Sequence, residues 1–330
     1  MKLKEGKKEL NKVLNKTAPT RDAFGEEMVS LGSEFKDIVV LEADISKSTR
    51  TSYFAQKYPE RFINVGVAEQ NEMAISAGLA SCGATPFIST YAVFASMRAC
   101  EQIRTFICYP NLNVKIAVSH GGLTPGSDGV THQATEDMGI LSTFPNMTVV
   151  MPADYYSARK IVREAYHYKG PVYMRFTRDA VPPIYDGNEE FKIGKANILI
   201  KGKDLTIIGI GDMVYYCIQA AKRLKESGIN ASVIDMHTVK PLDEDVLLNF
   251  AHCSKGIITV EDHQIKNGLG SAVSDFICEK YPIFVKKVGL KNTFAESGEY
   301  KLLLKKYDMD TDYIVKTAEK LLRDIKDIKK

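Results

Sequence analysis

Glu69 stands where an apolar run, residues 62–67, gives way to a helical pattern that includes Met73. The apolar run predicts a short buried strand, and Gly66 lets the backbone turn after it. A carboxylate at such a junction can hydrogen-bond to a ring nitrogen and exchange a proton with it. A glutamate in the first turn of a helix more often only complements the helix dipole. Glu69 alone therefore does not decide between chemistry and helix stabilisation.

Two histidines and two arginines add further chemistry. His120 follows another apolar run, and His132 lies with Asp128 in the glycine-rich segment 126–133. Loop histidines near a carboxylate can shuttle protons or bind hydroxyl and phosphate groups. Arg21 and Arg178 are the candidates for gripping a phosphate through paired N–H donors, although a surface ion pair is the commoner role for either one.

The elements that must position these residues follow a regular alternation. Apolar runs at 37–42, 85–90, 114–119, 148–151 and 171–175 alternate with helical patterns of ten or more residues. This alternation predicts an α/β fold whose mostly parallel sheet is flanked by helices on both faces. A linker at 180–191 precedes a second set of the same kind, beginning with a strand at 205–210. We therefore expect two domains, at 17–185 and 186–330, after a lysine-rich arm at 1–16.

Polar side chains gather where the predicted strands of the first domain end. They are Asp44, Glu69, Tyr91, His120 and Arg178. Ligands of open α/β sheets bind at the carboxyl ends of the strands. The sequence therefore predicts a binding site at this edge of the first sheet.

Composition excludes several classes of protein. The 330 residues carry a formal net charge of +3, which is too small to suggest a nucleic-acid partner. No apolar run reaches the ~20 residues that a membrane span needs, and the lysine-rich start lacks the apolar core of a secretory signal. The six cysteines form no CxxC pair, so we interpret them as reduced core thiols. A cytoplasmic location is expected.

Other short motifs carry little weight. Residues 209–214 (Gly-Ile-Gly-Asp-Met-Val) resemble a dinucleotide fingerprint, but the third glycine is missing, so a tight strand-to-helix turn is the better interpretation. The chain has no GxxxxGK[ST], GxSxG or HExxH motif. The histidines lack metal-ligand spacing, so no metal site is expected in this chain.

Five motifs in series resemble the transketolase family. They are the Gly-Val-Ala-Glu-Gln-Asn core of 61–73, Ser-Thr-Tyr at 89–91 with Phe94, Ser-Asp-Gly-Val-Thr-His-Gln at 127–133, Lys-Pro-Leu-Asp at 240–243 and Val-Glu-Asp-His at 260–263. The resemblance runs from about residue 17 to the end. It covers the pyrimidine-binding and C-terminal domains of the family but not the diphosphate-binding domain.

The resemblance implies a split enzyme. The missing domain holds the diphosphate of thiamine diphosphate and its Mg²⁺ (or Ca²⁺), so this chain would need a partner subunit that carries it. Self-association within a heterotetramer is expected. The activity implied is transfer of a two-carbon ketol unit from a ketose phosphate to an aldose phosphate.

The resemblance also assigns roles to individual residues. Glu69 matches the catalytic glutamate that acts on the aminopyrimidine ring, and His132 would assist catalysis. Asp44, Tyr91 and Phe94 match residues around the cofactor. The residues that match substrate-binding positions are Arg21, Ser48, His120, Asp128, His132 and Arg178.

The sequence departs from the family pattern at two places, so the resemblance does not determine the preferred substrate. Val130 stands where many relatives have proline, and segment 122–126 lacks an acidic residue that is common just before Asp128. The alternatives are a 2-oxo-acid dehydrogenase β subunit, a deoxyxylulose phosphate synthase-like enzyme and a catalytically silent scaffold subunit. A nicotinamide-dependent dehydrogenase would depend only on the weak match at 209–214.

Overall fold

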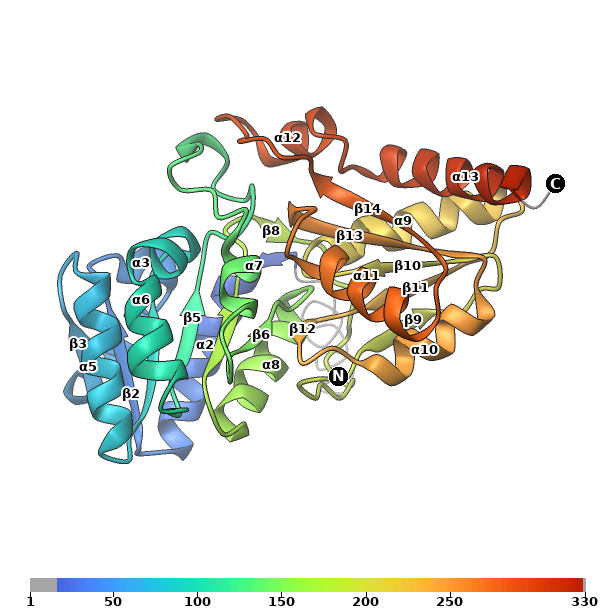
Figure 1. The fold of residues 1–330 in the computed structure, drawn as a ribbon. Helices are drawn as coiled ribbons and strands as arrows, with labels where there is room; N and C mark the ends of the chain where they lie inside the picture. Colours follow the sequence, from blue (N-terminus) through green and yellow to red (C-terminus); the bar gives the residue numbers. More distant parts are fainter. Residues whose placement is uncertain (1–16, 329–330) are drawn as a thin grey trace, which may run out of the picture.

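Two sheets, each flanked by helices, organise the chain in the computed structural model, which describes residues 17–328 (Figure 1). The first sheet has seven strands in the order β12-β6-β7-β5-β4-β2-β3, and all but β12 run parallel. The bounds are β2 (Ile38–Glu42), β3 (Phe62–Asn64), β4 (Thr85–Ser89), β5 (Lys115–Val118), β6 (Thr148–Val150), β7 (Val172–Arg175) and β12 (Thr238–Lys240). The predicted fold class is confirmed. The predicted arm at 1–16 lies outside the described residues.

Helices cover both faces of this sheet because each presents an apolar stripe to it. One face carries α2 (Thr20–Glu34), α4 (Ser52–Lys57) and α8 (Tyr155–His167), which share an apolar cluster. The other face carries α5 (Glu69–Ser81), a helical segment through 92–108, and α7 (Asp137–Ser142). The short α3 (Ser46–Thr49) follows β2. The two-stranded pair β1 (Ala18–Pro19) and β8 (Ala180–Val181) joins the ends of this domain.

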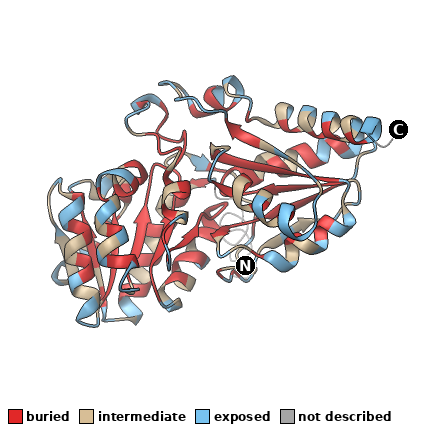
Figure 2. Ribbon diagram, in the orientation of Figure 1, coloured by how far each residue is buried: buried red, intermediate tan, exposed pale blue. Residues whose placement is uncertain are grey.

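The second sheet has the order β14-β13-β10-β11-β9, with β9 antiparallel to β11. Its strands are β9 (Asn197–Ile200), β10 (Leu205–Gly209), β11 (Ala231–Asp235), β13 (Gly256–Gln264) and β14 (Phe284–Leu290). The helices of this half are α9 (Met213–Glu226), α10 (Glu244–Cys253), α11 (Leu269–Lys280), α12 (Tyr300–Lys306) and α13 (Thr311–Ile328). Both sheets are buried along most of their length, and the exposed residues lie on the outer helices and loops (Figure 2).

Strand β12 connects the two halves. It belongs in sequence to the second half, yet it pairs with β6 and so completes the first sheet. Lys240 at its end donates from Nζ to the carbonyls of Ser142 and Phe144, at 2.9 and 2.6 Å. The Lys-Pro-Leu-Asp motif therefore lies on the seam between the halves.

Several local predictions are wrong. Strand β3 ends at Asn64 and is a half-buried edge strand, because it has only β2 as a neighbour. The helical pattern between the runs at 85–90 and 114–119 is not a regular α-helix, because it contains two π-helical stretches, Phe94–Arg98 and Ile103–Cys108. The cysteines are unpaired, but Cys82, Cys253 and Cys278 are exposed and are not core thiols.

The segment 209–214 forms the tight turn that the sequence predicts. Strand β10 ends at Gly209, Gly211 has a φ of +61°, and α9 begins at Met213. An added Cβ at Gly211 would lie 2.3 Å from the Met151 side chain, so packing and backbone conformation both require glycine there. Within residues 17–328, none of the helices has the length and apolar character needed to cross a membrane.

Candidate active site

Glu69 is the first residue of α5, and its carboxylate is almost wholly buried, with 2% of the residue exposed. Both of its oxygens accept from Nη1 of Arg98, at 2.7 and 2.8 Å. The Arg98 guanidinium also lies over the Phe94 ring, 4.3 Å from its centroid. Arg98 was not predicted from the sequence. The signal that could have found it is the spacing of four residues from Phe94, which places an arginine over an aromatic ring on a helical surface.

Aromatic and imidazole rings form a second group. The Tyr91 ring lies 3.9 Å from the His120 ring and 5.7 Å from Phe94, measured between centroids. The His132 ring meets both Tyr91 and Phe94 edge-on, at 5.8 and 5.5 Å. Four residues predicted from three separate segments are thus in contact at one edge of the first sheet.

His120 is held in an unusual backbone conformation after β5. Its φ is +63°, the residue is buried, and Nδ1 lies 2.8 Å from the Ser119 hydroxyl. Burial and the nearby Arg21 and Arg178 guanidinium groups lower the pKa of His120 to about 3. The imidazole is therefore neutral near pH 7, and it acts through hydrogen bonds rather than through charge.

Arginines gather beside this ring. Arg21 donates from Nη1 to the Ser48 carbonyl at 2.9 Å, while its buried Nε has no hydrogen-bond partner. Arg178 lies 3.4 Å from the Asp128 carboxylate and donates to the Pro125 carbonyl. Burial and the neighbouring Arg50 lower the pKa of Arg21. Guanidinium groups gathered in this way, one with an unused buried donor, have the charge and the donors that could bind an anion such as a phosphate monoester.

Asp44 lies just after β2, and its side chain is hydrogen-bonded to the last residue of β3 rather than to the ring cluster. It is exposed, has a φ of +67°, and accepts from the Asn64 side chain at 3.1 Å. It acts on the buried Glu42 at the end of β2 both through a backbone hydrogen bond, which lowers the pKa of Glu42, and through its charge, which raises it. Asp44 is therefore at the predicted edge of the sheet, while its predicted contact with a cofactor stays a prediction.

Two further buried carboxyl groups were missed. Burial raises the pKa of Glu42 to about 7, although both its oxygens accept from the Ile45 N–H. Burial and the nearby Glu42 carboxyl raise the pKa of Glu72 well above its usual range. Glu72 accepts from Ser89 N–H at 3.2 Å, and its other oxygen has no partner. The spacing of three residues between Glu69 and Glu72 on one helix was the available signal.

The arrangement suits a particular kind of ligand. A buried carboxylate beside two aromatic rings can hold a flat heteroaromatic ring that carries a basic nitrogen, because stacking and one hydrogen bond act together. Loop 123–135 brings Asp128 and His132 to the same edge, and the arginines lie beyond it. Among residues 17–328 there is no group of three side chains placed to hold a metal ion.

Comparison with protein families gives two matches that together span most of the chain. Residues 16–183 match the pyrimidine-binding domain of transketolase, and residues 194–314 match the transketolase C-terminal domain. A protein of Methanocaldococcus jannaschii, named as a transketolase C-terminal section, is 44% identical over 300 residues, covering 90% of this chain and 94% of that protein. One of the subunits of an apulose-4-phosphate transketolase from Phocaeicola vulgatus is 38% identical over 305 residues, covering 92% of this chain and 97% of that relative.

A solved structure described as a split-gene transketolase, an inactive β4 tetramer, superposes with a TM-score of 0.86 at 45% identity, covering 93% of this chain and 99% of that one. Human transketolase and a 1-deoxy-D-xylulose-5-phosphate synthase of Desulfitobacterium hafniense are each 36% identical, over 307 and 315 residues. The alignments cover 92% and 94% of this chain, which spans about half (49%) of each relative. The two domain matches and the identities across nearly the whole chain show that this protein belongs to the transketolase family.

Proposed function

We propose that this chain is one subunit of a thiamine diphosphate-dependent transketolase that moves a two-carbon ketol unit from a ketose phosphate to an aldose phosphate. The observation that carries the proposal is the order of groups along the sheet edge. Buried Glu69 is linked through Arg98 and Phe94 to Tyr91 and His132, and His120 then joins Tyr91 to the arginines. One end fits an aminopyrimidine ring, and the other fits a sugar phosphate.

When bound, the cofactor supplies a carbon nucleophile that accepts the two-carbon unit. Glu69 would hold a proton between its carboxylate and a ring nitrogen of the pyrimidine. Tyr91 and Phe94 would contact the ring and exclude water. Stacking of the rings would add about 1 kcal/mol to the binding free energy, beyond the contribution of the buried apolar area. Asp44 would lie at the rim of this half of the site.

The substrate half would use the remaining predicted residues. Asp128 and His132 would bind hydroxyl groups of the sugar, with His132 also handling a proton. The neutral imidazole of His120 would hydrogen-bond to the sugar. Arg21, Ser48 and Arg178 would bind the phosphate, Ser48 through its side-chain hydroxyl, and the unused Nε of Arg21 supports this assignment.

A partner subunit is part of the proposal. It would carry the diphosphate-binding domain with its Mg²⁺ (or Ca²⁺), and two copies of each chain would form a heterotetramer. The relatives named as a C-terminal section and as one subunit of a transketolase support a division of the enzyme between chains. The description of the related β4 tetramer as inactive supports a requirement for the other chain. A cytoplasmic location remains our expectation.

The sugar substrates form a second question. Val130 lies on loop 123–135 between Asp128 and His132 and is 43% exposed. Identity to the human transketolase and to the deoxyxylulose phosphate synthase is equal, so identity does not separate these activities. A deoxyxylulose phosphate synthase-like reaction is therefore the second candidate.

The deciding experiment is an assay of ketol transfer from xylulose 5-phosphate to ribose 5-phosphate, with thiamine diphosphate and Mg²⁺. The chain is assayed alone and with the subunit encoded beside it. We expect activity only in the mixture. Activity of the chain alone would contradict the split site. Turnover of pyruvate in its place would favour the synthase or 2-oxo-acid dehydrogenase alternatives, and no turnover with either substrate would favour a silent scaffold.

A further inference from the structure

Leu123, the first residue of loop 123–135, is anchored in the other domain. Its side chain packs in the same apolar cluster as Met213, Val260 and Tyr300 of the C-terminal domain. Its backbone N–H donates to both carboxylate oxygens of Asp262, at 3.1 and 2.9 Å. Asp262 is buried in strand β13, where it also accepts from the Tyr300 hydroxyl at 3.3 Å. The loop therefore begins inside the core of a domain that supplies none of the predicted site residues.

The tip of the loop lies against the segment that precedes α12. The backbone N–H of Gly298 donates to the Gly126 carbonyl at 3.3 Å, and the Gln133 side-chain amide donates to the Glu296 carbonyl at 3.1 Å. A Cβ on Gly129 would lie 2.4 Å from the Ser297 hydroxyl, so the two backbones approach closely there. In Figure 1 the loop, drawn in green, reaches toward this red segment.

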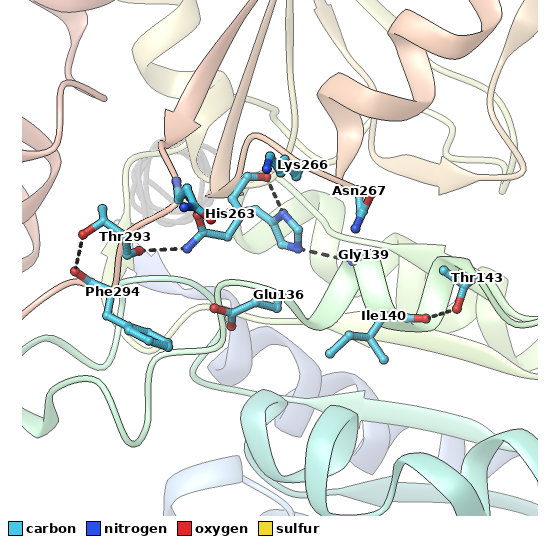
Figure 3. A pocket seen from close by; sticks show the side chains of 11 residues that line it. Glu136, Gly139, Ile140, Thr143, His263, Lys266, Asn267, Thr293 and Phe294 are labelled. Atoms are coloured by element: carbon cyan, nitrogen blue, oxygen red, sulfur yellow. Dashed lines mark hydrogen bonds between the residues drawn. The ribbon is translucent and has the colours of Figure 1, made fainter.

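The end of the loop is held by strand β13 and by Arg175. Arg175, which is fully buried, donates from Nη2 to the carbonyls of Ala134 and Asp262, at 2.8 and 2.9 Å. Gln264 N–H donates to the Thr135 carbonyl at 2.8 Å. His263 lines a cavity of about 610 Å³ together with residues of α7, and its Nε2 accepts from Gly139 N–H at 3.2 Å (Figure 3).

The residue before the loop shows how close this contact is. Gly122 has a φ of +60°, and a Cβ there would lie 2.1 Å from the Asp262 carboxylate. Only glycine lets the backbone adopt this conformation and approach the carboxylate. In the Val-Glu-Asp-His motif at 260–263, it is thus the Asp262 side chain that contacts the base of the loop. Within the motif, Glu261 instead accepts from Leu269 and Gly270 N–H at the start of α11.

We propose that Asp262 is a positioning residue: it fixes the loop that presents Asp128 and His132, so that the C-terminal domain sets the geometry of substrate binding without touching the substrate. The part that concerns substrate rests on the function proposed above. The anchoring of the loop does not, and it can be measured on the chain alone.

The first measurement is hydrogen–deuterium exchange of the full chain, comparing wild type with Asp262→Asn. Asparagine keeps the volume but replaces one of the two oxygens that accept from Leu123 N–H with an amide nitrogen, which cannot accept. Leaving this N–H with a weaker acceptor predicts that amides of 123–133 exchange about tenfold faster or more. The strands of both sheets should keep their protection. Unchanged exchange in the loop, or an equal increase over the whole chain, would overturn the proposal.

Asp235→Asn is the matched control. Asp235 is also a buried aspartate of the C-terminal domain that accepts from a tyrosine hydroxyl, Tyr185, at 2.6 Å. It ends strand β11, and its hydrogen bond leads to the linker rather than to the loop. Its variant should leave exchange of 123–133 unchanged. If Asp262→Asn does not fold, Leu123→Ala tests the same anchor from the loop side, with the same expected result and the same contradicting one.

The second measurement is kinetic and uses the variant chain reconstituted with the partner subunit. Misplacing Asp128 and His132 should raise KM for the sugar phosphates about tenfold or more, and more than it lowers kcat. A fall in kcat with KM unchanged would contradict the positioning role. If neither protein shows ketol transfer while the exchange result stands, the proposed function fails and the anchoring of the loop survives.

Discussion

At the scale of single residues, Glu69 is positioned by the start of α5 and by Arg98, and no local sequence pattern links these two features. The start of α5 buries it, and Arg98 pairs with it from a segment 29 residues away. Arg98 itself is 46% exposed, whereas the Glu69 carboxyl group is buried. The contact with Arg98 thus fixes the direction in which the buried carboxyl group points.

Glu69→Gln should leave the fold intact and remove activity in the reconstituted enzyme. The amide has the same shape but cannot exchange the proton, so kcat should fall about 10²-fold or more. The measurement is kcat together with a thermal melt of the chain. Glu101→Gln, a change on the exposed surface of the helical segment after Phe94, is the control that should retain wild-type turnover. Wild-type turnover in Glu69→Gln would remove the proposed mechanism.

Arg178→Ala should raise KM for phosphorylated sugars more than it lowers kcat, because the lost guanidinium binds the phosphate in ground and transition states alike. We expect KM to rise roughly tenfold, which corresponds to the free energy of one lost hydrogen bond to a charged group. Steady-state kinetics with both sugar substrates provide the measurement. Arg223→Ala removes an exposed arginine that pairs with Asp312, and it should change neither constant. An unchanged KM in Arg178→Ala would refute the phosphate assignment.

Asp235 offers a test by pH. Burial raises the pKa of Asp235 to about 8, from an ordinary value near 3.8. The folded chain then keeps a proton that the unfolded chain loses between about pH 4 and pH 8, so stability from this group falls as pH rises through that range. Asp235→Asn removes the effect. The free energy of unfolding of Asp235→Asn, relative to that of wild type, should therefore increase by up to about 1.4 kcal/mol per pH unit and level off above pH 8.

Urea unfolding at pH 5, 6, 7 and 8 measures this difference. The highly exposed Asp245 provides a control, since Asp245→Asn should follow wild type at every pH. A constant difference between Asp235→Asn and wild type across the range would show that the carboxyl group is ionised throughout.

At the scale of elements, the segment 92–108 carries two different surfaces. Its buried side packs on the first sheet, while Met97 and Phe106 remain 47% and 42% exposed and Tyr109 is 85% exposed just beyond it. Within the first π-helical stretch, Phe94 contacts Tyr91 and His132 of the site, while Met97 is exposed. We therefore expect the outward face of this segment to form an interface with another copy of the chain.

We expect the double change Met97→Glu and Phe106→Glu to weaken self-association of the chain, because charges would be buried against the apposed copy. Sedimentation velocity across a concentration series measures it. Phe294 is 74% exposed on the C-terminal domain, and Phe294→Glu provides the control. An unaltered assembly in the double variant would place the interface elsewhere.

The elements also show what sequence reasoning can and cannot reach. The alternation of apolar runs predicted the parallel sheet, and strand ends predicted where Glu69, Tyr91 and His120 gather, because both follow from local pattern. Strand β9 was missed, and the pairing of β12 with β6 could not be seen, since it joins residues about 90 positions apart on an edge. Arg98 and Glu42 were missed because their roles depend on burial by other elements. The site roles carried over from the family resemblance remain predictions.

At the scale of the whole molecule, each domain is completed by residues that belong in sequence to the other. Strand β12 closes the first sheet, Leu123 lies in the second core, and Arg175 contacts both halves. Neither half can open without exposing part of the other. We therefore expect the chain to unfold in one cooperative transition rather than as two domains.

Differential scanning calorimetry measures this directly. The calorimetric and van't Hoff enthalpies should agree for the isolated chain at a concentration where its assembly state is fixed. The variant Lys240→Met, which removes the two hydrogen bonds from Lys240 to the carbonyls of 142 and 144, should lower the single midpoint without splitting it. Two resolved transitions in wild type would show that the halves are thermodynamically separate.

Strand β12 also has a consequence for synthesis. Strand β6 pairs with β7, which follows it in the chain, and its other edge stays open until β12 is translated roughly 90 residues after β6, on the order of 5 to 20 seconds at ribosomal speed. During that interval the nascent first domain presents an unpaired edge beside a buried apolar sheet, the kind of surface that recruits neighbouring chains. The need for chaperone protection should thus fall on this window of translation, and it should end when residues 238–240 emerge.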